Sequence, residues 1–130
     1  MYIDTACRIK FNNGISVPFP SESGVKQGDV LSPLLFNFFI DDLTQELTGS
    51  AFDPVVIGNT STNILLYADD IVLLSQSKEG LQNCLNTLYD YCSVWKLQVN
   101  IDKSKVIVFN SNGKSFLDHF MYKNKTIETV

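Results

Sequence analysis

The stretch ILLYADDIVLLS, residues 64–75, sets two adjacent aspartates, Asp69 and Asp70, between two short apolar arms. Both arms are rich in β-branched and large apolar residues, which is typical of buried strands. The stretch therefore predicts a β-hairpin with both carboxylates at its tip. Two neighbouring carboxylates repel each other by about 3 kcal/mol at an effective dielectric of about 20, and by less than about 1 kcal/mol in open water. We therefore expect a rigid tip of this kind to hold a cation.

An Asp-Asp pair also has a plainer interpretation as turn chemistry. Aspartate tolerates the left-handed region and hydrogen-bonds to its own backbone, although Asn-Gly or Asp-Gly is the stronger choice for a two-residue turn. For an arbitrary Asp-Asp pair the turn interpretation is the better one, because short motifs often match by chance. The sequence around this pair favours the metal-binding interpretation.

The composition indicates one small domain with a hydrophobic core. The chain has 130 residues, of which 45% are hydrophobic and 12% aromatic. Its longest strongly apolar stretch, residues 34–40, is far shorter than the roughly 20 residues of a membrane span, and its start lacks the features of a signal peptide. These observations predict a soluble intracellular protein without a membrane partner.

The cysteines and the histidine do not predict a metal centre. Three cysteines make an odd count without metal-ligand spacing, and the single histidine has no evident partner in the sequence. We therefore expect the cysteines to be reduced and mostly in the core. The cysteines are Cys7, Cys84 and Cys92, and the histidine is His119.

Charge is distributed unevenly along the chain. The net charge is −4, which argues against a free-standing nucleic-acid binder. Residues 1–95 carry four basic and eleven acidic side chains, whereas residues 96–130 carry six lysines and three acidic side chains. This asymmetry suits an acidic metal site beside a mildly basic segment, although such charge runs are more often solvated faces.

The first part of the chain predicts a hairpin, a loop and a helix. Residues 7–11 and 15–19 alternate like strands around the turn signal Asn12-Asn13-Gly14. A polar loop with glycines at both ends follows, and glycine permits close approach of another molecule. Ser32 as N-cap and Pro33 predict a helix that continues to residue 47 and stops at Gly49. Its acidic residues are expected on a solvated face; they are Asp41, Asp42 and Glu46.

The second part predicts a short strand at 55–57, the Asp-Asp hairpin at 63–75 and a helix over 77–95 capped by Ser75 or Ser77. This helix has the clearest helical period in the chain, through Leu81, Cys84, Leu85, Leu88, Tyr91, Cys92 and Trp95. Residues 97–101 and 106–109 are expected to be strands around a lysine-bearing turn. A last hairpin is expected within 116–130, turning at 123–125.

Taken in order, these motifs resemble the palm of a reverse transcriptase. GVKQGDVLSPLLFN (24–37) is similar to the second palm motif of that family, YADD (67–70) to the third, and LQVNIDKS (97–104) to the fourth. The sequences of these three motifs are most similar to those of non-LTR, LINE-like retrotransposons. The resemblance implies an RNA-directed DNA polymerase located in the nucleus or cytoplasm, and its partners would be an RNA template, a DNA primer and deoxynucleotides.

The resemblance also implies a site. Two Mg²⁺ ions, or Mn²⁺ as a substitute, clamp the attacking and leaving oxygens of phosphoryl transfer. Asp69 would bridge the metals and Asp70 would assist or orient. The template and nucleotide would lie against Lys26, Gln27 and Gly28. For two residues both a functional and an ordinary structural interpretation stay open. Lys103 would protonate the pyrophosphate, or it is a solvent-exposed charge on a turn. Tyr67 would lie near the primer terminus, or it is part of the core.

The fold that the resemblance implies is α+β. It is a split βαββαβ, ferredoxin-like antiparallel sheet with two helices on one face, flanked by an N-terminal hairpin (1–20) and a C-terminal hairpin (116–130). Between these hairpins come the loop and helix (21–49), the Asp-Asp hairpin (63–75), the second helix (77–95) and the lysine-turn strands (97–109). No residue here matches the family's first palm motif, which supplies a strand and another metal-binding aspartate. We therefore expect a single partial domain over 1–130, with two open sheet edges, marginal stability, weak nucleic-acid binding and no polymerase activity alone.

Two other classes of function share parts of this pattern. A non-catalytic, domesticated palm fragment that serves as an interaction module would carry the same motifs, and metal binding without catalysis would be its signature. Another two-carboxylate nucleotidyl-transfer enzyme would share the hairpin but would not require the glycine loop followed by Ser32-Pro33.

Overall fold

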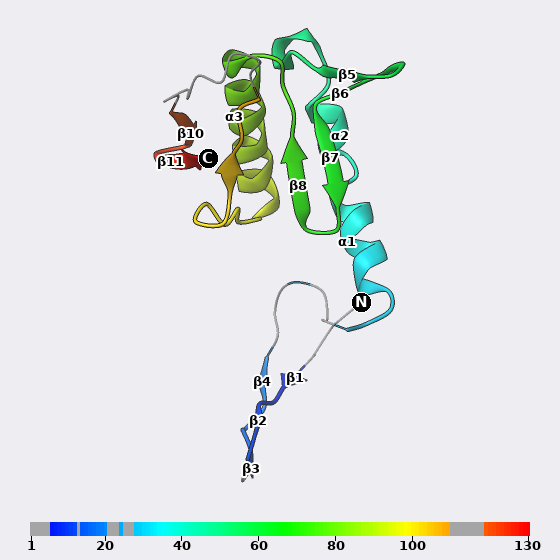
Figure 1. Ribbon diagram of the computed structural model, residues 1–130. Helices are drawn as coiled ribbons and strands as arrows, with labels where there is room; N and C mark the ends of the chain where they lie inside the picture. Colours follow the sequence, from blue (N-terminus) through cyan, green and yellow to red (C-terminus); the bar gives the residue numbers. More distant parts are fainter. Residues whose placement is uncertain (1–5, 13, 21–23, 25–27, 110–118) are drawn as a thin grey trace. The chain divides into compact units, whose positions relative to one another are not determined.

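The structure, a computed structural model, describes residues 6–12, 14–20, 24, 28–109 and 119–130 (Figure 1). The chain divides into two compact units, Met1–Phe38 and Phe39–Val130, and each is described by itself.

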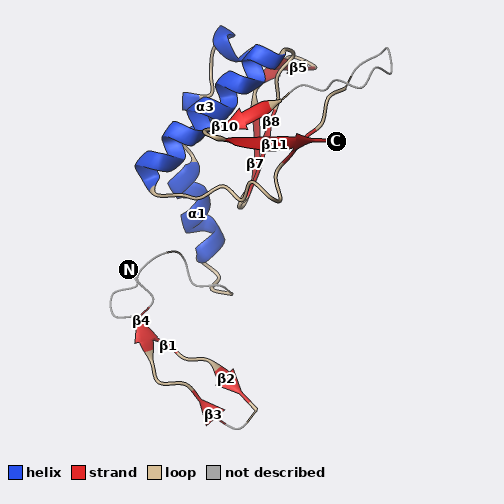
Figure 2. Ribbon diagram, turned by 90° about the vertical axis from the view of Figure 1, so that its left-hand side faces the viewer, coloured by secondary structure: helices blue, strands red, loops and turns tan. Residues whose placement is uncertain are grey.

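The first unit holds the predicted N-terminal hairpin (Figure 2). Its strands are β1 (Ala6–Cys7), β2 (Lys10–Phe11), β3 (Gly14–Ile15) and β4 (Phe19–Pro20), and β1 pairs with β4 and β2 with β3, both antiparallel.

A β-bulge interrupts this hairpin. Ser16 N donates to Ile9 O at 2.9 Å, and the next backbone pair is Cys7 with Phe19. Val17 and Pro18 therefore lie opposite Arg8 alone, which is the two-against-one count of a bulge. Proline lacks the N–H that a regular ladder would use at this point, so the bulge falls where the sequence cannot pair.

The helix that starts at Ser32-Pro33 is shorter than the sequence predicts. α1 covers Ser32–Ile40 and α2 covers Leu43–Glu46, with a turn at 41–42 between them. The hydroxyl of Thr44 donates to the carbonyl of Asp41 at 2.9 Å, and aspartate is a weak helix former. The continuous helix to residue 47 was therefore a wrong prediction, because the apolar spacing runs across a break between two short helices.

Gly49 does not terminate that helix as expected. It has φ +133 and precedes a 3₁₀-helix, η1 (Ser50–Phe52). The solvated acidic face needs a similar refinement, because Asp42, although exposed, accepts a hydrogen bond of 2.5 Å from the Tyr91 hydroxyl. Burial and this neighbouring carboxylate raise the pKa of Tyr91.

Two antiparallel hairpins follow η1. β5 (Val55–Ile57) is the predicted short strand, and it pairs with β6 (Thr60–Thr62), which the sequence pattern did not predict. β7 (Ile64–Tyr67) and β8 (Asp70–Leu73) form the predicted Asp-Asp hairpin.

The helix α3 (Lys78–Trp95) organises the core of the second unit. The Ser77 hydroxyl accepts a hydrogen bond from Gly80 N at 3.0 Å, so Ser77 is the N-cap and confirms one of the two predicted candidates. α3 packs against β8, α2, η1 and β10. One core cluster is formed by Leu43, Leu47, Ile64, Cys84, Leu88, Tyr91 and Cys92. Burial raises the pKa of the Cys84 thiol to about 11, in keeping with a reduced core cysteine.

The region after α3 corrects the predicted lysine-turn strands. Residues 97–101 form no strand; Leu97 N donates to Cys92 O at 2.9 Å, which closes the end of α3. Leu97 and Val99 pack onto the core, so their alternation reflects burial and not strand pairing. Only β9 (Lys105–Val106) is a strand in the second predicted stretch.

The C-terminal hairpin is present as β10 (Phe120–Tyr122) and β11 (Lys125–Thr129), and residues 116–118 of the predicted stretch lie outside the described residues. β11 also pairs with β9, in parallel, so this three-stranded sheet is not wholly antiparallel. On the far side of β10, the Gln82 amide of α3 donates to Met121 O at 2.8 Å and accepts from Met121 N at 3.0 Å.

The whole is a small α+β fold with short sheets, as expected at that level. In the part of the chain that the structure describes, β7–β8 and β10–β11–β9 are separate sheets, so the ferredoxin-like sheet stays a prediction. No helix among them is both long and apolar enough to cross a membrane.

Candidate functional site

A tight turn carries the two aspartates. Tyr67 pairs with Asp70, so only Ala68 and Asp69 lie between the strands. Ala68 has φ +53, a left-handed conformation that a residue with a Cβ seldom adopts. Backbone strain of this kind costs about 1–3 kcal/mol and persists where the surrounding structure fixes it. Here the strand pairing on both sides fixes it.

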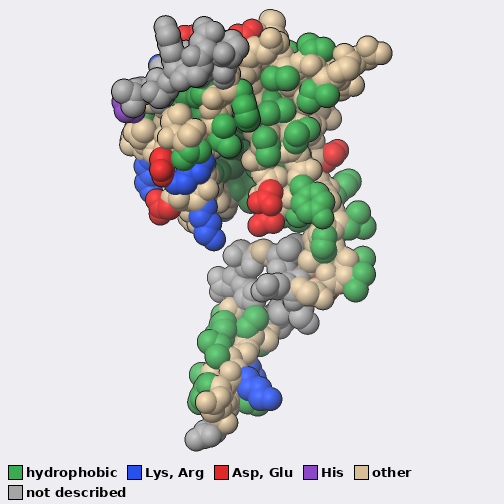
Figure 3. Space-filling view, in the orientation of Figure 1, with side chains coloured by type: hydrophobic (Ala, Val, Ile, Leu, Met, Phe, Trp, Pro, Cys, Tyr) green, Lys and Arg blue, Asp and Glu red, His purple; other side chains and the backbone are tan. Residues whose placement is uncertain are grey.

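Both carboxylates face solvent at this tip. Asp69 and Asp70 are exposed, and neither makes a side-chain hydrogen bond or ion pair within the described residues. In the space-filling view, acidic side chains gather at the tip end of the second unit (Figure 3). Hard carboxylate oxygens that are free of other partners fit Mg²⁺, which is bound in proteins by one or two carboxylates together with water and phosphate oxygens. The described residues hold no group of three or more acidic, histidine or cysteine ligands.

The hairpin has one buried and one open face. Ile64 is buried and Leu66, Ile71 and Leu73 pack against the core clusters, whereas the alternate residues point outward. Tyr67 is 83% exposed, so of its two predicted roles the core role was wrong. Tyr67 pairs with Asp70 across the hairpin and shares the open face with Leu65 and Val72.

The opposite end of the hairpin is held by a polar clamp that sequence reasoning missed. Asn63 is only 5% exposed, and its side-chain amide donates to Phe52 O at 2.9 Å and to Leu74 O at 3.0 Å. The Ser75 hydroxyl donates to the same Phe52 carbonyl at 2.8 Å. η1 is thereby fixed to both strands of the hairpin.

Gly80 completes this clamp in the first turn of α3. A Cβ on Gly80 would lie 2.6 Å from Phe52 O and 2.3 Å from Ser75 Oγ, so the helix start and η1 touch only because the residue is glycine. The signal for this contact was present in the sequence as a glycine inside a periodic helix, which points to close packing.

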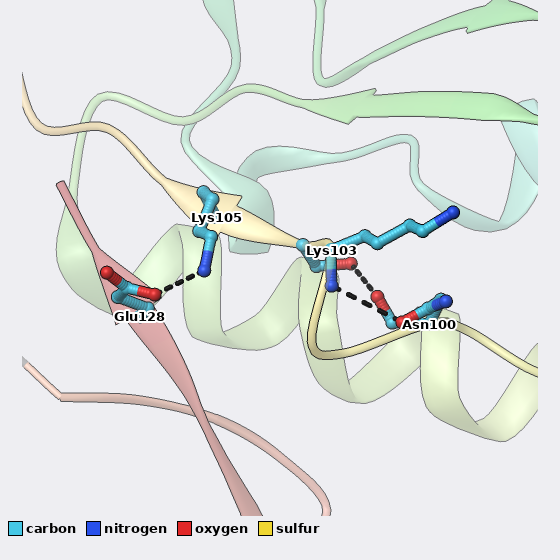
Figure 4. Close-up of polar contacts among 5 residues, drawn as sticks. Asn100, Lys103, Lys105 and Glu128 are labelled. Atoms are coloured by element: carbon cyan, nitrogen blue, oxygen red, sulfur yellow. Dashed lines mark hydrogen bonds and ion pairs between the residues drawn. The ribbon is translucent and has the colours of Figure 1, made fainter.

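Lys103 lies at the same end of the second unit as the carboxylates. Figure 1 shows the turn at 100–104 at the end of the unit where β7 meets β8. Asn100 shapes this turn, since its backbone oxygen accepts from Lys103 N at 3.2 Å and its side-chain oxygen at 3.3 Å. Figure 4 shows the Lys103 side chain extending away from the ion pair between Lys105 and Glu128. An exposed ammonium group is thus available at that end.

The predicted nucleotide-contacting loop is described only at its edges. Lys26 and Gln27 lie outside the described residues. Gly24 and Gly28, with φ +85 and +82, belong to the first unit, and both are exposed, so that a Cβ added to either would meet nothing within 4 Å. Their left-handed backbone explains why glycine stands at each end of the loop.

Comparison with known proteins agrees with the motifs. The pattern of the family described as "Reverse transcriptase (RNA-dependent DNA polymerase)" matches residues 1–128. The Pol polyprotein of the type-2 retrotransposable element R2DM of Drosophila melanogaster is 41% identical over 88 residues, which is 68% of this chain and 8% of that protein. The probable RNA-directed DNA polymerase from transposon BS of the same species is 35% identical over 107 residues, 78% of this chain and 11% of that protein.

A third relative is the RNA-directed DNA polymerase from mobile element jockey of Drosophila melanogaster, 28% identical over 120 residues, which is 80% of this chain and 13% of that protein. The chain thus spans about a tenth of the length of these relatives. The family match covers nearly the whole chain. The chain therefore belongs to the reverse transcriptase family and resembles its non-LTR retrotransposon members.

Proposed function

We propose that this chain forms the carboxylate-bearing part of an RNA-directed DNA polymerase that extends a DNA primer along an RNA template. The observation that carries the proposal is the exposed pair Asp69 and Asp70 at a tight hairpin tip, in a chain of the reverse transcriptase family. The substrates would be an RNA template, a DNA primer and deoxynucleotides in the nucleus or cytoplasm.

The two aspartates would hold Mg²⁺, with Mn²⁺ as a substitute, and the metal would supply charge stabilisation for phosphoryl transfer. Asp69 would take the bridging position and Asp70 would orient. The two-residue turn limits how far these carboxylates move apart, so little conformational entropy is lost when both bind one cation. The proposal assigns the first-unit loop residues Lys26, Gln27 and Gly28 to the template and nucleotide.

Lys103 and Tyr67 have supporting roles in this proposal. Lys103 is exposed on the turn at 100–104, which lies at the carboxylate end of the unit, and its ammonium group would approach the triphosphate and protonate the leaving pyrophosphate. Tyr67 is exposed and pairs with Asp70 across the hairpin, and its ring would pack near the primer terminus.

Two acidic ligands are fewer than the family's polymerase site uses, so we expect the 130-residue chain alone to bind metal without polymerising. The first measurement is Mn²⁺ binding by electron paramagnetic resonance. Asp69→Asn and Asp70→Asn should each weaken binding, whereas Glu79→Gln, which removes a carboxylate from the first turn of α3, should not. Equal binding by all of these chains would contradict the metal role.

The second measurement is incorporation of deoxynucleotides on a primed RNA template by the same chain. We expect none above background. Incorporation that Asp69→Asn abolishes would show that the chain is a complete polymerase, and would keep the catalytic assignment while overturning the expected inactivity.

A further inference from the structure

The N-terminal hairpin has a cationic face that the site described above does not use. We propose that Arg8 and Lys10 bind the phosphodiester backbone of a nucleic-acid strand, so that the hairpin over residues 6–20 is a separate nucleic-acid contact. This inference rests on the proposed function for the identity of the partner, but on different residues and in the other compact unit.

Alternation of side chains along an extended chain places these two cations on one face. Lys10 pairs with Ile15 and Phe11 pairs with Gly14, so Lys10 and Phe11 point to opposite sides of the ribbon. Arg8 is two residues before Lys10 and shares its face, at a spacing of about 7 Å along the strand. Phe11 covers Gly14 on the other face, where a Cβ on Gly14 would lie 3.3 Å from the ring.

The bulge lies on the strand opposite Arg8. Val17 and Pro18 face Arg8 in place of a single cross-strand residue, and it is their strand that bends, so Arg8 stays on the regular strand. Arg8 is the only arginine in the chain, and its planar guanidinium group matches a phosphate with two parallel hydrogen bonds. Arg8 and Lys10 are both exposed, and neither forms a side-chain hydrogen bond or ion pair within the described residues.

Local charge supports an anionic partner. Residues 6–20 contain these two basic side chains and no acidic one, whereas the whole chain has a net charge of −4. Figure 3 shows basic side chains gathered on one side of the hairpin. The charge complementarity therefore selects the polyanionic backbone of a nucleic-acid strand.

The test is the salt dependence of binding, measured by fluorescence anisotropy with labelled RNA and DNA oligomers of one sequence. Each lost phosphate contact should reduce the slope of log K against log salt by about 0.7 on a single strand. We therefore expect Arg8→Gln and Lys10→Gln each to lower the slope by about 0.7, and the double variant by about 1.4. The RNA and DNA arms show whether the template or the primer is the preferred strand.

The matched control is Lys125→Gln, which removes an exposed lysine from a strand of the other hairpin and changes the net charge equally. It should leave the slope unchanged, and Arg8→Lys should keep the slope while weakening the affinity. Absence of binding by the unmodified chain at low salt, an equal slope change in Lys125→Gln, or equal binding of polyglutamate would each overturn the proposal. Asp69→Asn should not change the slope, so failure of the metal site and failure of this contact are distinguishable.

Discussion

The two ends of the β7–β8 hairpin are built in opposite ways. At one end Asn63, Ser75 and Gly80 meet the backbone of Phe52 in a set of partly buried hydrogen bonds and close contacts. At the other end Asp69 and Asp70 face solvent on a turn whose Ala68 has a positive φ. The difference teaches that this hairpin is anchored at its base, so that polar groups at its tip remain free for another molecule. Substitutions at the base should therefore cost more folding stability than substitutions at the tip.

The largest effect is expected at Gly80. Gly80→Ala puts a Cβ against the Phe52 carbonyl, which is backbone and cannot rotate away, so η1 or the start of α3 has to shift. We expect the free energy of unfolding to fall by about 3 kcal/mol in urea denaturation, the upper part of the range for overpacking. Glu79→Ala, at the neighbouring exposed position, should stay within about 0.5 kcal/mol. A Gly80→Ala chain as stable as the parent would show that the contact is loose.

Asn63 should come next. Asn63→Ala removes the amide that satisfies Leu74 O and one of the donors to Phe52 O, and it leaves the partly buried Leu74 carbonyl without its side-chain partner. We expect a loss of about 2 kcal/mol in the same measurement. Asn86→Ala, on the exposed side of α3, is the matched control and should change stability by less than half as much. Equal losses in both variants would remove the distinction between base and surface.

Ala68 tests whether the tip is under backbone strain. Ala68→Val sets a β-branched residue at positive φ and should destabilise the fold by about 1–2 kcal/mol. Ala68→Gly should be neutral or stabilising by up to about 1 kcal/mol. Glycine relieves the backbone strain of the folded state, but it also raises the conformational entropy of the unfolded chain, and the two effects oppose each other. The expected thermal unfolding temperature is highest for the chain with glycine at position 68, intermediate for alanine and lowest for valine. The reverse order would mean that the turn has another conformation.

The smallest effect is expected from the carboxylates themselves. Without divalent ions, Asp69→Asn and Asp70→Asn should each raise the free energy of unfolding by less than about 1 kcal/mol, since they remove a repulsion in water. Added Mg²⁺ should stabilise the parent chain in proportion to the logarithm of its concentration, and both variants less. Asp102→Asn should respond to Mg²⁺ as the parent does. If Mg²⁺ stabilised the parent and the three variants equally, the carboxylates at the hairpin tip would not be its binding site.

The sequence predicted best those features that depend on local chemistry. The Asp-Asp hairpin, the Ser77 cap and the N-terminal and C-terminal hairpins follow from apolar alternation and capping residues close in sequence. The length of the helix after Ser32 was overestimated because apolar residues recur at helical spacing on both sides of residues 41–42. In the structure the Thr44 hydroxyl donates a hydrogen bond to the carbonyl of Asp41, and the helix is interrupted there. The strand at 97–101 was predicted from an alternation that serves packing on α3.

The polar clamp lay beyond sequence reasoning for a different reason. Asn63 and Ser75 are common loop residues, and their meeting with Phe52 depends on how η1 folds back onto the hairpin, over separations of 11 and 23 residues. The roles of Asp69, Asp70 and Lys103 stay predictions. The residues Lys26 and Gln27 fall outside the part that the structure describes.

The side-chain amide of Gln82 hydrogen-bonds to both backbone groups of Met121, and this limits where a further strand can pair with the sheet. A helix side chain there replaces the neighbour that another strand would supply, so the ladder terminates at β10. Within the described residues β9 pairs on one side only, with β11. Extension of the three-stranded sheet is thus unidirectional, and any additional strand from the same or another polypeptide has to join beside Lys105 and Val106.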